Sequence, residues 1–353
     1  MYRLGESIEH APVVRHINPP KDFLKWAKIG EHIIRHYNEG WAGGFHWDIQ
    51  YWEIWNEADG DEFSTKKLVW GGTKEEFFDF FEVSCRYLKE TLPELKIGGP
   101  ALAGNWKWGV DLIREMGRRN CPMDFFSWHM YQWTIEAYEE RTKLFKDTLL
   151  ESGYPEAELI VDEWNYVESW NHQARSFRKL VGPTGAAFCG AFMVAMQHSA
   201  NDMAVYFEAD VVKEWCGIFQ VKDMCIGQFA KGKDMGLLEP RKPFYAFKAF
   251  GLLQKLGDEV ESSCEGKGVY VCAAADEEEG AVMLVSYHSS IVDGCHEVTL
   301  TGLPADGCTI EVYMTDEGYD EKLEMTVECA EESVVLPFNM VDEQIRLIRV
   351  KKH

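Results

Sequence analysis

Hydrophobic positions follow two alternating patterns over roughly the first 256 residues. Short apolar runs, typical of buried strands, alternate with longer segments in which apolar residues recur every three or four positions, as in amphipathic helices. Strands are predicted at 2–9, 49–55, 95–99, 124–130, 158–163 and 203–208, and helices at 21–39, 73–92, 106–119, 135–151, 183–199 and 243–256. Thr73 and Glu76 have capping-box spacing, and Gly40 suits a helix C-terminus.

Apolar strands that are separated by helices belong to parallel sheets. These strand–helix units therefore predict an α/β fold, a TIM-type (β/α)8 barrel domain that lacks two of its eight units. After residue 257 the pattern changes to strands at 269–275, 281–288, 295–301, 308–315, 321–328, 332–337 and 344–350, with turn residues between them. This pattern predicts an antiparallel β-sandwich. We expect a barrel-type catalytic domain at 1–256 and a sandwich domain at 257–353.

Composition narrows the class of function. The formal net charge is -23, from 36 basic and 59 acidic residues, and it argues against binding to nucleic acid or to anionic membranes. No apolar run is long enough for a transmembrane helix, and no apolar signal segment opens the sequence. The ten cysteines form no CxxC pair, so reduced thiols are favoured over a disulfide framework, which the even count leaves open. A cytoplasmic protein follows as an expectation.

Two predicted strands end in a carboxylate in the same setting. The segment 51–60 (YWEIWNEADG) runs from apolar residues into Asn56 and Glu57 and is broken by Asp-Gly, and the segment 159–165 (LIVDEWN) places Glu163 after an apolar strand. Chemistry in parallel barrels is located at the carboxyl ends of the strands. Glycoside hydrolysis requires two carboxyl groups, one as acid and one as nucleophile or base. The structural alternative is a strand-end glutamate that caps a loop or pairs with an arginine.

A third strand end, at 125–131 (FFSWHMY), carries His129 and Tyr131 two residues apart, so both side chains can point to one side. Either can form a hydrogen bond with a catalytic carboxylate or a sugar hydroxyl, although a lone histidine is often structural. The 13 tryptophans, several of them near strand ends, suit a carbohydrate site equally with an ordinary core. No histidine cluster, P-loop or Gly-x-Gly-x-x-Gly motif is present, so neither metal nor cofactor is implied.

These motifs resemble clan A glycoside hydrolases, and most of all glycoside hydrolase family 39, which includes β-xylosidases and α-L-iduronidases. The resemblance rests on Trp-Asn-Glu at 55–57 and Asp-Glu-Trp-Asn at 162–165. It extends to the segments 2–5 (YRLG), 96–101 (KIGGPA), 127–131 (SWHMY) and 242–247 (KPFYAF). It spans nearly the whole chain, and the C-terminal sandwich agrees with it.

The resemblance implies a role for each matching residue. Glu57 matches the general acid/base on strand 4, Asn56 the residue that binds the sugar 2-hydroxyl, and Glu163 the nucleophile on strand 7. His129 and Tyr131 fall on strand 6, where a group orients the nucleophile. The other expected substrate-binding residues are Phe207 and Glu208 at the end of strand 8, Trp164 and His10. Glu208 departs from the family pattern.

The expected function is retaining hydrolysis of β-linked glycosides, with an oligosaccharide or a small β-xyloside as substrate. Two alternatives remain: a weakly active or inactive carbohydrate-binding or scaffold protein, and an α-L-arabinofuranosidase. If Glu57 ends strand 4, then 2–9 is strand 3, and strands 1 and 2 are absent. Such a sheet has open edges, so we expect either that the sequence is an N-terminal truncation or that a homo-oligomer or a partner chain covers them.

Overall fold

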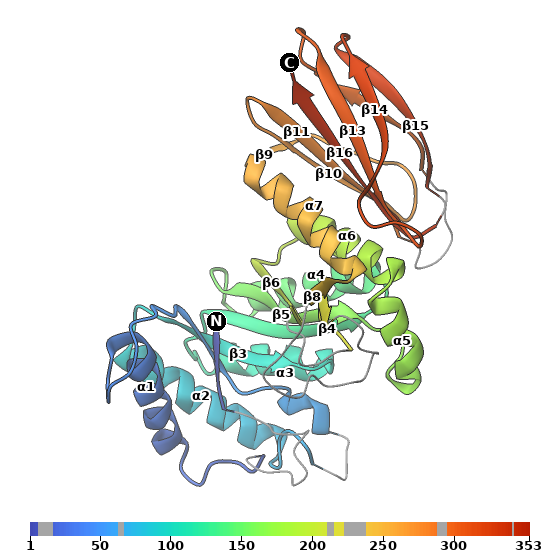
Figure 1. Cartoon of the computed structure of the whole chain (residues 1–353). Coiled ribbons are helices and arrows are strands. Elements are labelled where there is room, and N and C mark those ends of the chain that lie inside the picture. Colours follow the sequence, from blue (N-terminus) through green and yellow to red (C-terminus); the bar gives the residue numbers. More distant parts are fainter. Residues whose placement is uncertain (6–16, 63–66, 210–214, 222–237, 288–294, 341) are drawn as a thin grey trace. The chain divides into compact units, whose positions relative to one another are not determined.

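A computed structural model of the chain describes residues 1–5, 17–62, 67–209, 215–221, 238–287, 295–340 and 342–353 (Figure 1). The described chain divides into two compact units. The first comprises Met1–Met130, Tyr138–Trp164 and Ala200–Val205, and the second comprises Tyr131–Ala137, Asn165–Ser199 and Tyr206–His353. His10 lies outside the described residues. The domain boundary that the sequence predicts at residue 256 stays a prediction.

A parallel sheet forms the centre of the first unit, and three of its strands continue into residues of the second. Its order is β1-β2-β3-β4-β5-β6, and the parallel register pairs Arg3 with Glu53 and Glu53 with Gly98. The strands are β1 (Tyr2–Leu4), β2 (Tyr51–Ile54), β3 (Lys96–Leu102), β4 (Phe125–Gln132), β5 (Glu158–Tyr166) and β6 (Met203–Tyr206). Six sequential parallel strands with helices between them fit an incomplete TIM barrel. The six strands that the sequence predicts are therefore confirmed within a few residues, apart from 6–9, which are not described.

Helices connect these strands, as periodicity predicts. They are α1 (Phe23–Glu39), α2 (Lys74–Thr91), α3 (Trp106–Arg118) and α4 (Ile135–Glu151). The capping box of α2 is present in both directions between Thr73 and Glu76, and Gly40 ends α1 with a φ of 74°. Helices α1 and α2 lie side by side (Figure 1), where Phe80 packs edge-on against Trp26 with ring centroids 4.6 Å apart.

Helices and a small hairpin open the second unit. They are η2 (Trp170–His172), α5 (Gln173–Leu180), α6 (Pro183–Gln197), β7 (Phe219–Val221), β8 (Leu238–Pro240) and α7 (Lys242–Leu256). Helix α6 is buried almost all round, whereas α5 and the β7–β8 hairpin were not predicted because α5 has only eight residues and β7 and β8 have three each. Among the described helices, none alone is long and apolar enough to span a membrane. Trp170–Leu180 with Pro183–Gln197 meets that test by length and composition as a pair, across an 88° bend.

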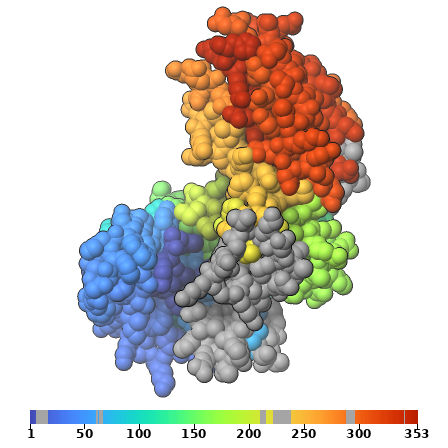
Figure 2. Space-filling view, viewed as in Figure 1, coloured from blue at the N-terminus to red at the C-terminus, as the bar shows by residue number. Residues whose placement is uncertain are grey.

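The C-terminal strands are antiparallel, as the alternation predicts. They are β9 (Asp258–Val260), β10 (Val269–Ala275), β11 (Glu279–Ser286), β12 (Cys295–Thr301), β13 (Cys308–Thr315), β14 (Lys322–Cys329), β15 (Ser333–Met340) and β16 (Gln344–Lys352). One sheet has the order β14-β13-β16-β11-β10-β9, and β12 pairs with β15 in another. Ile310, Leu336 and Ile348 belong to the core that these strands enclose. The strands form one continuous body in the space-filling view (Figure 2, orange to red). This region fits the predicted sandwich.

Candidate active site

The chain turns sharply where β2 ends, and Glu57 lies in that turn. Trp55 and Glu57 have positive φ angles of 71° and 52°, a conformation that costs a non-glycine residue about 1–3 kcal/mol and concentrates at functional sites. The Glu57 N–H donates to the Ala101 carbonyl oxygen at 2.9 Å. A 3₁₀ turn, η1 (Ala58–Asp61), follows directly. The end of β2 is thus held in a strained conformation by its neighbour β3.

Asp59 secures the turn that carries Glu57. Its carboxylate accepts hydrogen bonds from the backbone N–H groups of Ala103, Gly104 and Asn105 at 2.8, 3.0 and 2.8 Å. Burial raises the pKa of Asp59 in spite of these three donors. From the sequence, the Asp-Gly dipeptide at 59–60 predicted the end of the strand and no further role. The structure shows that Asp59 also joins the loop after β2 to the loop after β3.

His129, on β4, bridges the two predicted catalytic residues. Its ring is fully buried, and Nδ1 lies 2.8 Å from Glu57 Oε1 and 3.5 Å from Glu163 Oε2. Nε2 lies 3.2 Å from Asp162 Oδ2. Burial lowers the pKa of His129, but the carboxylates of Asp162 and Glu163 outweigh it and hold that pKa well above its usual value. His129 is therefore a cation among carboxylates.

Glu57 and Glu163 lie close together, as the strand-end argument predicts. One carboxylate oxygen from each residue and one nitrogen of His129 all lie within 4.8 Å of one another. The Glu57 side chain is 26% exposed and that of Glu163 is 16% exposed, so both retain access to solvent. The three atoms have a spacing that a metal ion could occupy, but the short contacts of His129 with both carboxylates already account for it.

Arg3, on β1, completes the charged cluster beside Glu163. Its Nε donates to Glu53 Oε2 at 2.6 Å, one terminal nitrogen donates to Asp162 Oδ2 at 2.8 Å, and the other donates to Glu163 Oε1 at 3.2 Å. Burial lowers the pKa of Arg3, but the three carboxylates more than reverse this and raise it. One guanidinium therefore holds residues from β1, β2 and β5 together.

Sequence reasoning missed Arg3, Glu53 and Asp162 as members of the site. Two of them, Glu53 and Asp162, stand at positions in the sequence that could have drawn attention to them. Glu53 stands between Trp52 and Ile54 in a strand that is buried along most of its length, and a charged residue in such a strand requires a partner. Asp162 directly precedes Glu163, yet its partner was not readable, because the contacts with Arg3 and His129 span 159 and 33 residues.

Asn56 and Trp164 flank the two glutamates in the sequence and are both buried, at 9% and 2% exposure. The Asn56 side-chain oxygen has no hydrogen-bond partner among the described residues. A buried polar atom of this kind is normally satisfied, so Asn56 can accept a hydrogen bond from a ligand hydroxyl. The predicted contacts of Asn56 and Trp164 with substrate stay predictions.

The remaining predicted residues belong to the second unit, where they join an aromatic cluster. The Tyr131 ring centroid lies 5.5 Å from that of Trp170 and 6.4 Å from that of Phe207, and Trp215 lies 6.2 Å from Tyr131. Trp170 is 48% exposed. Glu208 accepts a hydrogen bond from the Ile218 N–H at 3.2 Å through its backbone oxygen. Exposed aromatic rings provide the flat apolar surface on which sugar C–H faces can rest.

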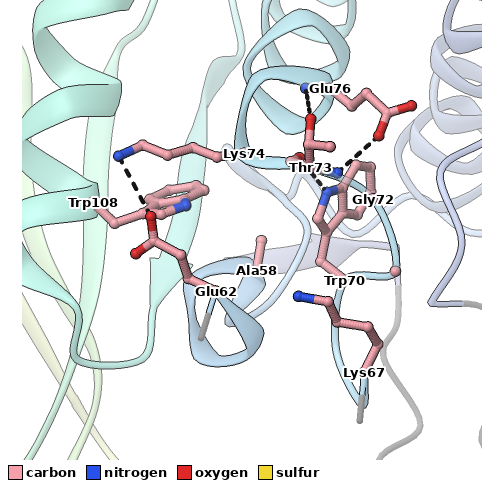
Figure 3. A pocket seen from close by; sticks show the side chains of 10 residues that line it. Ala58, Glu62, Lys67, Trp70, Gly72, Thr73, Lys74, Glu76 and Trp108 are labelled. Atoms are coloured by element: carbon pink, nitrogen blue, oxygen red, sulfur yellow. Dashed lines mark hydrogen bonds and ion pairs between the residues drawn. The ribbon is translucent and has the colours of Figure 1, made fainter. Parts of the chain in front are cut away.

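A cavity of about 440 Å³ lies next to the turn that carries Glu57. Neither Glu57 nor Glu163 lines this cavity. Its lining residues are Ala58, Glu62, Lys67, Trp70, Gly71, Gly72, Thr73, Lys74, Glu76 and Trp108. Figure 3 shows Lys74 reaching toward Glu62, with 3.8 Å between the charged atoms, and the Trp70 indole N–H donating to the Thr73 carbonyl oxygen at 2.8 Å. Its charged groups are thus of both signs, which suits a neutral polar ligand.

Comparison with known proteins places the chain in a family. It is 26% identical over 290 residues to a β-xylosidase from Caldicellulosiruptor saccharolyticus, covering 77% of this chain and 55% of that one. A β-xylosidase from Geobacillus stearothermophilus is 25% identical over 268 residues, covering 69% and 48%. The chain thus spans about half the length of these curated relatives.

The fold agrees with these relatives. A glucosidase from Croceicoccus marinus superposes with a TM-score of 0.73 at 19% identity, covering 99% of this chain and 78% of that one. The model of glycosyl hydrolases family 39 matches residues 10–321, which is most of the sequence. The chain therefore belongs to glycosyl hydrolases family 39.

Proposed function

We propose that this chain hydrolyses β-linked glycosides with retention of configuration, with Glu57 as acid/base and Glu163 as nucleophile. The observation that supports this most is the distance of at most 4.8 Å between one carboxylate oxygen of each residue. Carboxyl groups are about 5–5.5 Å apart in retaining glycosidases and about 6.5–9.5 Å apart in inverting ones. The separation leaves no room for a water molecule between nucleophile and sugar, as inversion requires.

The reaction has two displacements. In the first, Glu163 attacks the anomeric carbon as the glycosidic bond breaks, and Glu57 gives its proton to the departing oxygen. In the second, Glu57 takes a proton from water, the water oxygen bonds to the anomeric carbon, and the bond to Glu163 breaks. Atoms and charge balance, because Glu57 regains the proton that it gave.

The neighbouring residues prepare both groups for these roles. Arg3 and the charged His129 lie 3.2 and 3.5 Å from the oxygens of Glu163 and stabilise its ionised form, which is the nucleophilic one. His129 Nδ1 also reaches Glu57 Oε1, so a protonated Glu57 keeps its other oxygen free to donate. Asn56 offers its unsatisfied oxygen to a sugar hydroxyl.

The proposed substrate is a β-xyloside, which the names of the two curated relatives support. We also propose that β1–β6 correspond to strands 3–8 of an eight-stranded barrel. Glu57 follows the second strand of this sheet and Glu163 lies within the fifth, three residues before its end, and this three-strand interval matches strands 4 and 7 in the family. The homo-oligomer or partner chain expected from the sequence stays a prediction, which size-exclusion chromatography with mass measurement addresses.

The six-stranded sheet favours one alternative, a carbohydrate-binding protein with little or no turnover. In an eight-stranded barrel two more strands add side chains to the mouth, and the described residues contain six. Rates on aryl β-xyloside, aryl β-glucoside and aryl α-arabinofuranoside separate the candidates. Binding of xylo-oligosaccharide by calorimetry without turnover of any of the three would favour the binding protein.

Azide rescue tests the two roles separately. In Glu163→Ala, azide should enter at the nucleophile's side and give a glycosyl azide of inverted configuration. In Glu57→Ala, azide should intercept the covalent intermediate and give the azide of retained configuration. Glu158→Ala is the matched control, because Glu158 lies at the other end of β5 and pairs with Lys96. Unchanged kcat in Glu163→Ala would disprove the assignment.

A further inference from the structure

A second pair of carboxyl groups, Glu53 and Asp162, lies behind the catalytic glutamates. Their side chains are 1% and 0% exposed, and Arg3 donates to one oxygen of each, at 2.6 and 2.8 Å. The pair is therefore cut off from water and shares one cation. Neither residue belongs to the acid and nucleophile of the proposed reaction.

The remaining oxygens of this pair have no donor. Glu53 Oε1 and Asp162 Oδ1 are both buried and have no hydrogen-bond partner among the described residues. Yet a hydrogen bond with Glu53 is among the interactions that lower the pKa of Asp162. Two ionised carboxylates have acceptors only, so they cannot form a hydrogen bond with each other. One proton between them would satisfy both oxygens.

The charges of the whole cluster require the same proton. The groups that face one another are Arg3 on β1, Glu53 and Glu57 on and after β2, His129 on β4, and Asp162 and Glu163 on β5. Asp59 also interacts with Glu57, but it has three backbone N–H donors of its own and is left out of the balance. With four ionised carboxylates against two cations the net charge is 2 − 4 = −2, and a proton on Glu57 leaves −1. A buried uncompensated charge is strongly unfavourable. A second proton brings the cluster to neutrality.

Glu53 is more readily protonated than Asp162. Asp162 accepts from both Arg3 and His129 at 2.8 and 3.2 Å, which stabilises its ionised form. Among the described residues, Glu53 has one cation as a hydrogen-bond partner, Arg3, at 2.6 Å, and the nearby Ser127 hydroxyl lowers its pKa but carries no charge. Burial and the Asp162 charge raise the pKa of Glu53 to about 7, whereas the pKa of Asp162 is lowered, because His129 and Arg3 outweigh its burial.

We propose that Glu53 is a neutral positioning residue, whose carboxyl proton is shared with Asp162 so that the charge of Arg3 remains available to Glu163. The inference rests on the proposed function in assigning Glu163 its role. Loss of this proton would add a negative charge behind the nucleophile and draw Arg3 toward Glu53. The consequence is an alkaline loss of activity that belongs to Glu53 rather than to Glu57.

Infrared spectroscopy in heavy water tests the proton directly, through the carbonyl stretch of protonated carboxyl groups. The comparison uses Glu57→Gln, which removes the acid's own signal, against Glu57→Gln with Glu53→Gln. At pH 6 the double variant should lose the intensity of one carboxyl group, and the pair Glu57→Gln with Glu311→Gln, altered on the sandwich surface, should lose none. Equal intensity in Glu57→Gln and in the double variant with Glu53→Gln would overturn the proposal.

Kinetics provide a second readout. Glu53→Gln keeps a neutral group at any pH, so its kcat/KM should lose the alkaline fall in activity that wild type owes to Glu53. Asp162→Asn removes a required charge and should reduce kcat at least ~10-fold more than Glu53→Gln does. Equal losses in the two variants would contradict the proposal.

The infrared measurement needs no turnover, so it separates this inference from the proposed function. If the chain hydrolysed no glycoside, the carboxyl signal would still report on Glu53. If Glu53→Gln failed to fold, titration of the signal in Glu57→Gln with Asp59→Asn, which lacks the other carboxyl group whose pKa burial raises, would decide. A band that disappears with a midpoint near pH 7 supports the shared proton, and its absence at pH 6 refutes it.

Discussion

The parallel sheet of the first unit and the C-terminal sandwich use charged residues in opposite ways. In the sandwich, Lys351 on β16 and Glu311 on the neighbouring β13 form a partly exposed pair of opposite charges, and such pairs contribute about 0–1 kcal/mol. At the strand ends of the sheet, Arg3 and His129 are surrounded by a larger number of carboxyl groups, two of them fully buried. The sandwich also holds a buried cation, Arg346, but this cation is paired with Glu324, so the excess of carboxyl groups over cations distinguishes the sheet as the candidate functional region.

The largest expected effect is the loss of catalysis in Glu163→Ala. Removal of a nucleophile that forms a covalent bond typically reduces kcat by about four orders of magnitude or more. Steady-state rates on aryl β-xyloside measure it. Glu311→Ala in the sandwich is the control and should leave the rate unchanged. Comparable losses in the two variants would break the contrast between the regions.

His129→Ala should have the next largest effect, on both stability and rate. The variant removes a buried cation and leaves Asp162 without one of its two charged partners, which for a broken buried ion pair costs about 3–5 kcal/mol of unfolding free energy. Urea unfolding followed by circular dichroism measures this. The matched variant is His353→Ala, whose exposed pair with Glu328 should be worth less than about 1 kcal/mol. Equal destabilisation would show that the buried cluster is no more sensitive than the surface.

Ile348→Ala tests whether the sandwich contributes to stability without contributing to catalysis. Ile348 is fully buried in the sandwich core, and truncation of such a side chain costs about 2–5 kcal/mol through lost burial and the cavity left behind. The rate constant of the folded protein should not change, because the Ile348 side chain is enclosed by the sandwich's own core. A fall in kcat without a fall in stability would give the sandwich a functional role.

The smallest expected effect concerns the free energy of unfolding, to which Glu53 in the sheet and Glu311 in the sandwich should contribute with opposite dependence on pH. The pKa of Glu53 is about 7 in the folded chain and about 4.3 unfolded, so the folded state retains a proton that the unfolded state releases. Its contribution to stability therefore falls as pH rises between these values and is constant above them. The pKa of Glu311 is lowered, chiefly by its hydrogen bond with Lys351, so its contribution is instead lost as pH falls.

Urea unfolding at pH 5 and pH 7.5 measures both signs. Glu53→Gln should reduce the loss of stability between the two pH values, and Glu311→Gln should act oppositely and weakly because the group is exposed. An unchanged pH dependence in Glu53→Gln would mean that Glu53 is ionised in the folded chain.

Local sequence patterns determined most of the secondary structure. Helix α2 begins after Thr73 because its side chain and that of Glu76 satisfy backbone donors within one turn. Strand β15 alternates exposed and buried residues, whereas β5 is buried along most of its length, which distinguishes an antiparallel from a parallel sheet. The β7–β8 hairpin and α5 escaped prediction because they are short.

The sequence by itself also placed Glu57 and Glu163 at the ends of parallel strands, since an apolar run followed by a carboxylate and a strand break is a local signal. The tertiary structure decided which groups surround them. Arg3 reaches Glu53 and Glu163 across 50 and 160 residues of sequence, and carboxylates from other strands raise the pKa of His129 in spite of its burial. Charge and protonation depend on distances between such residues, and those distances exist in the folded chain alone.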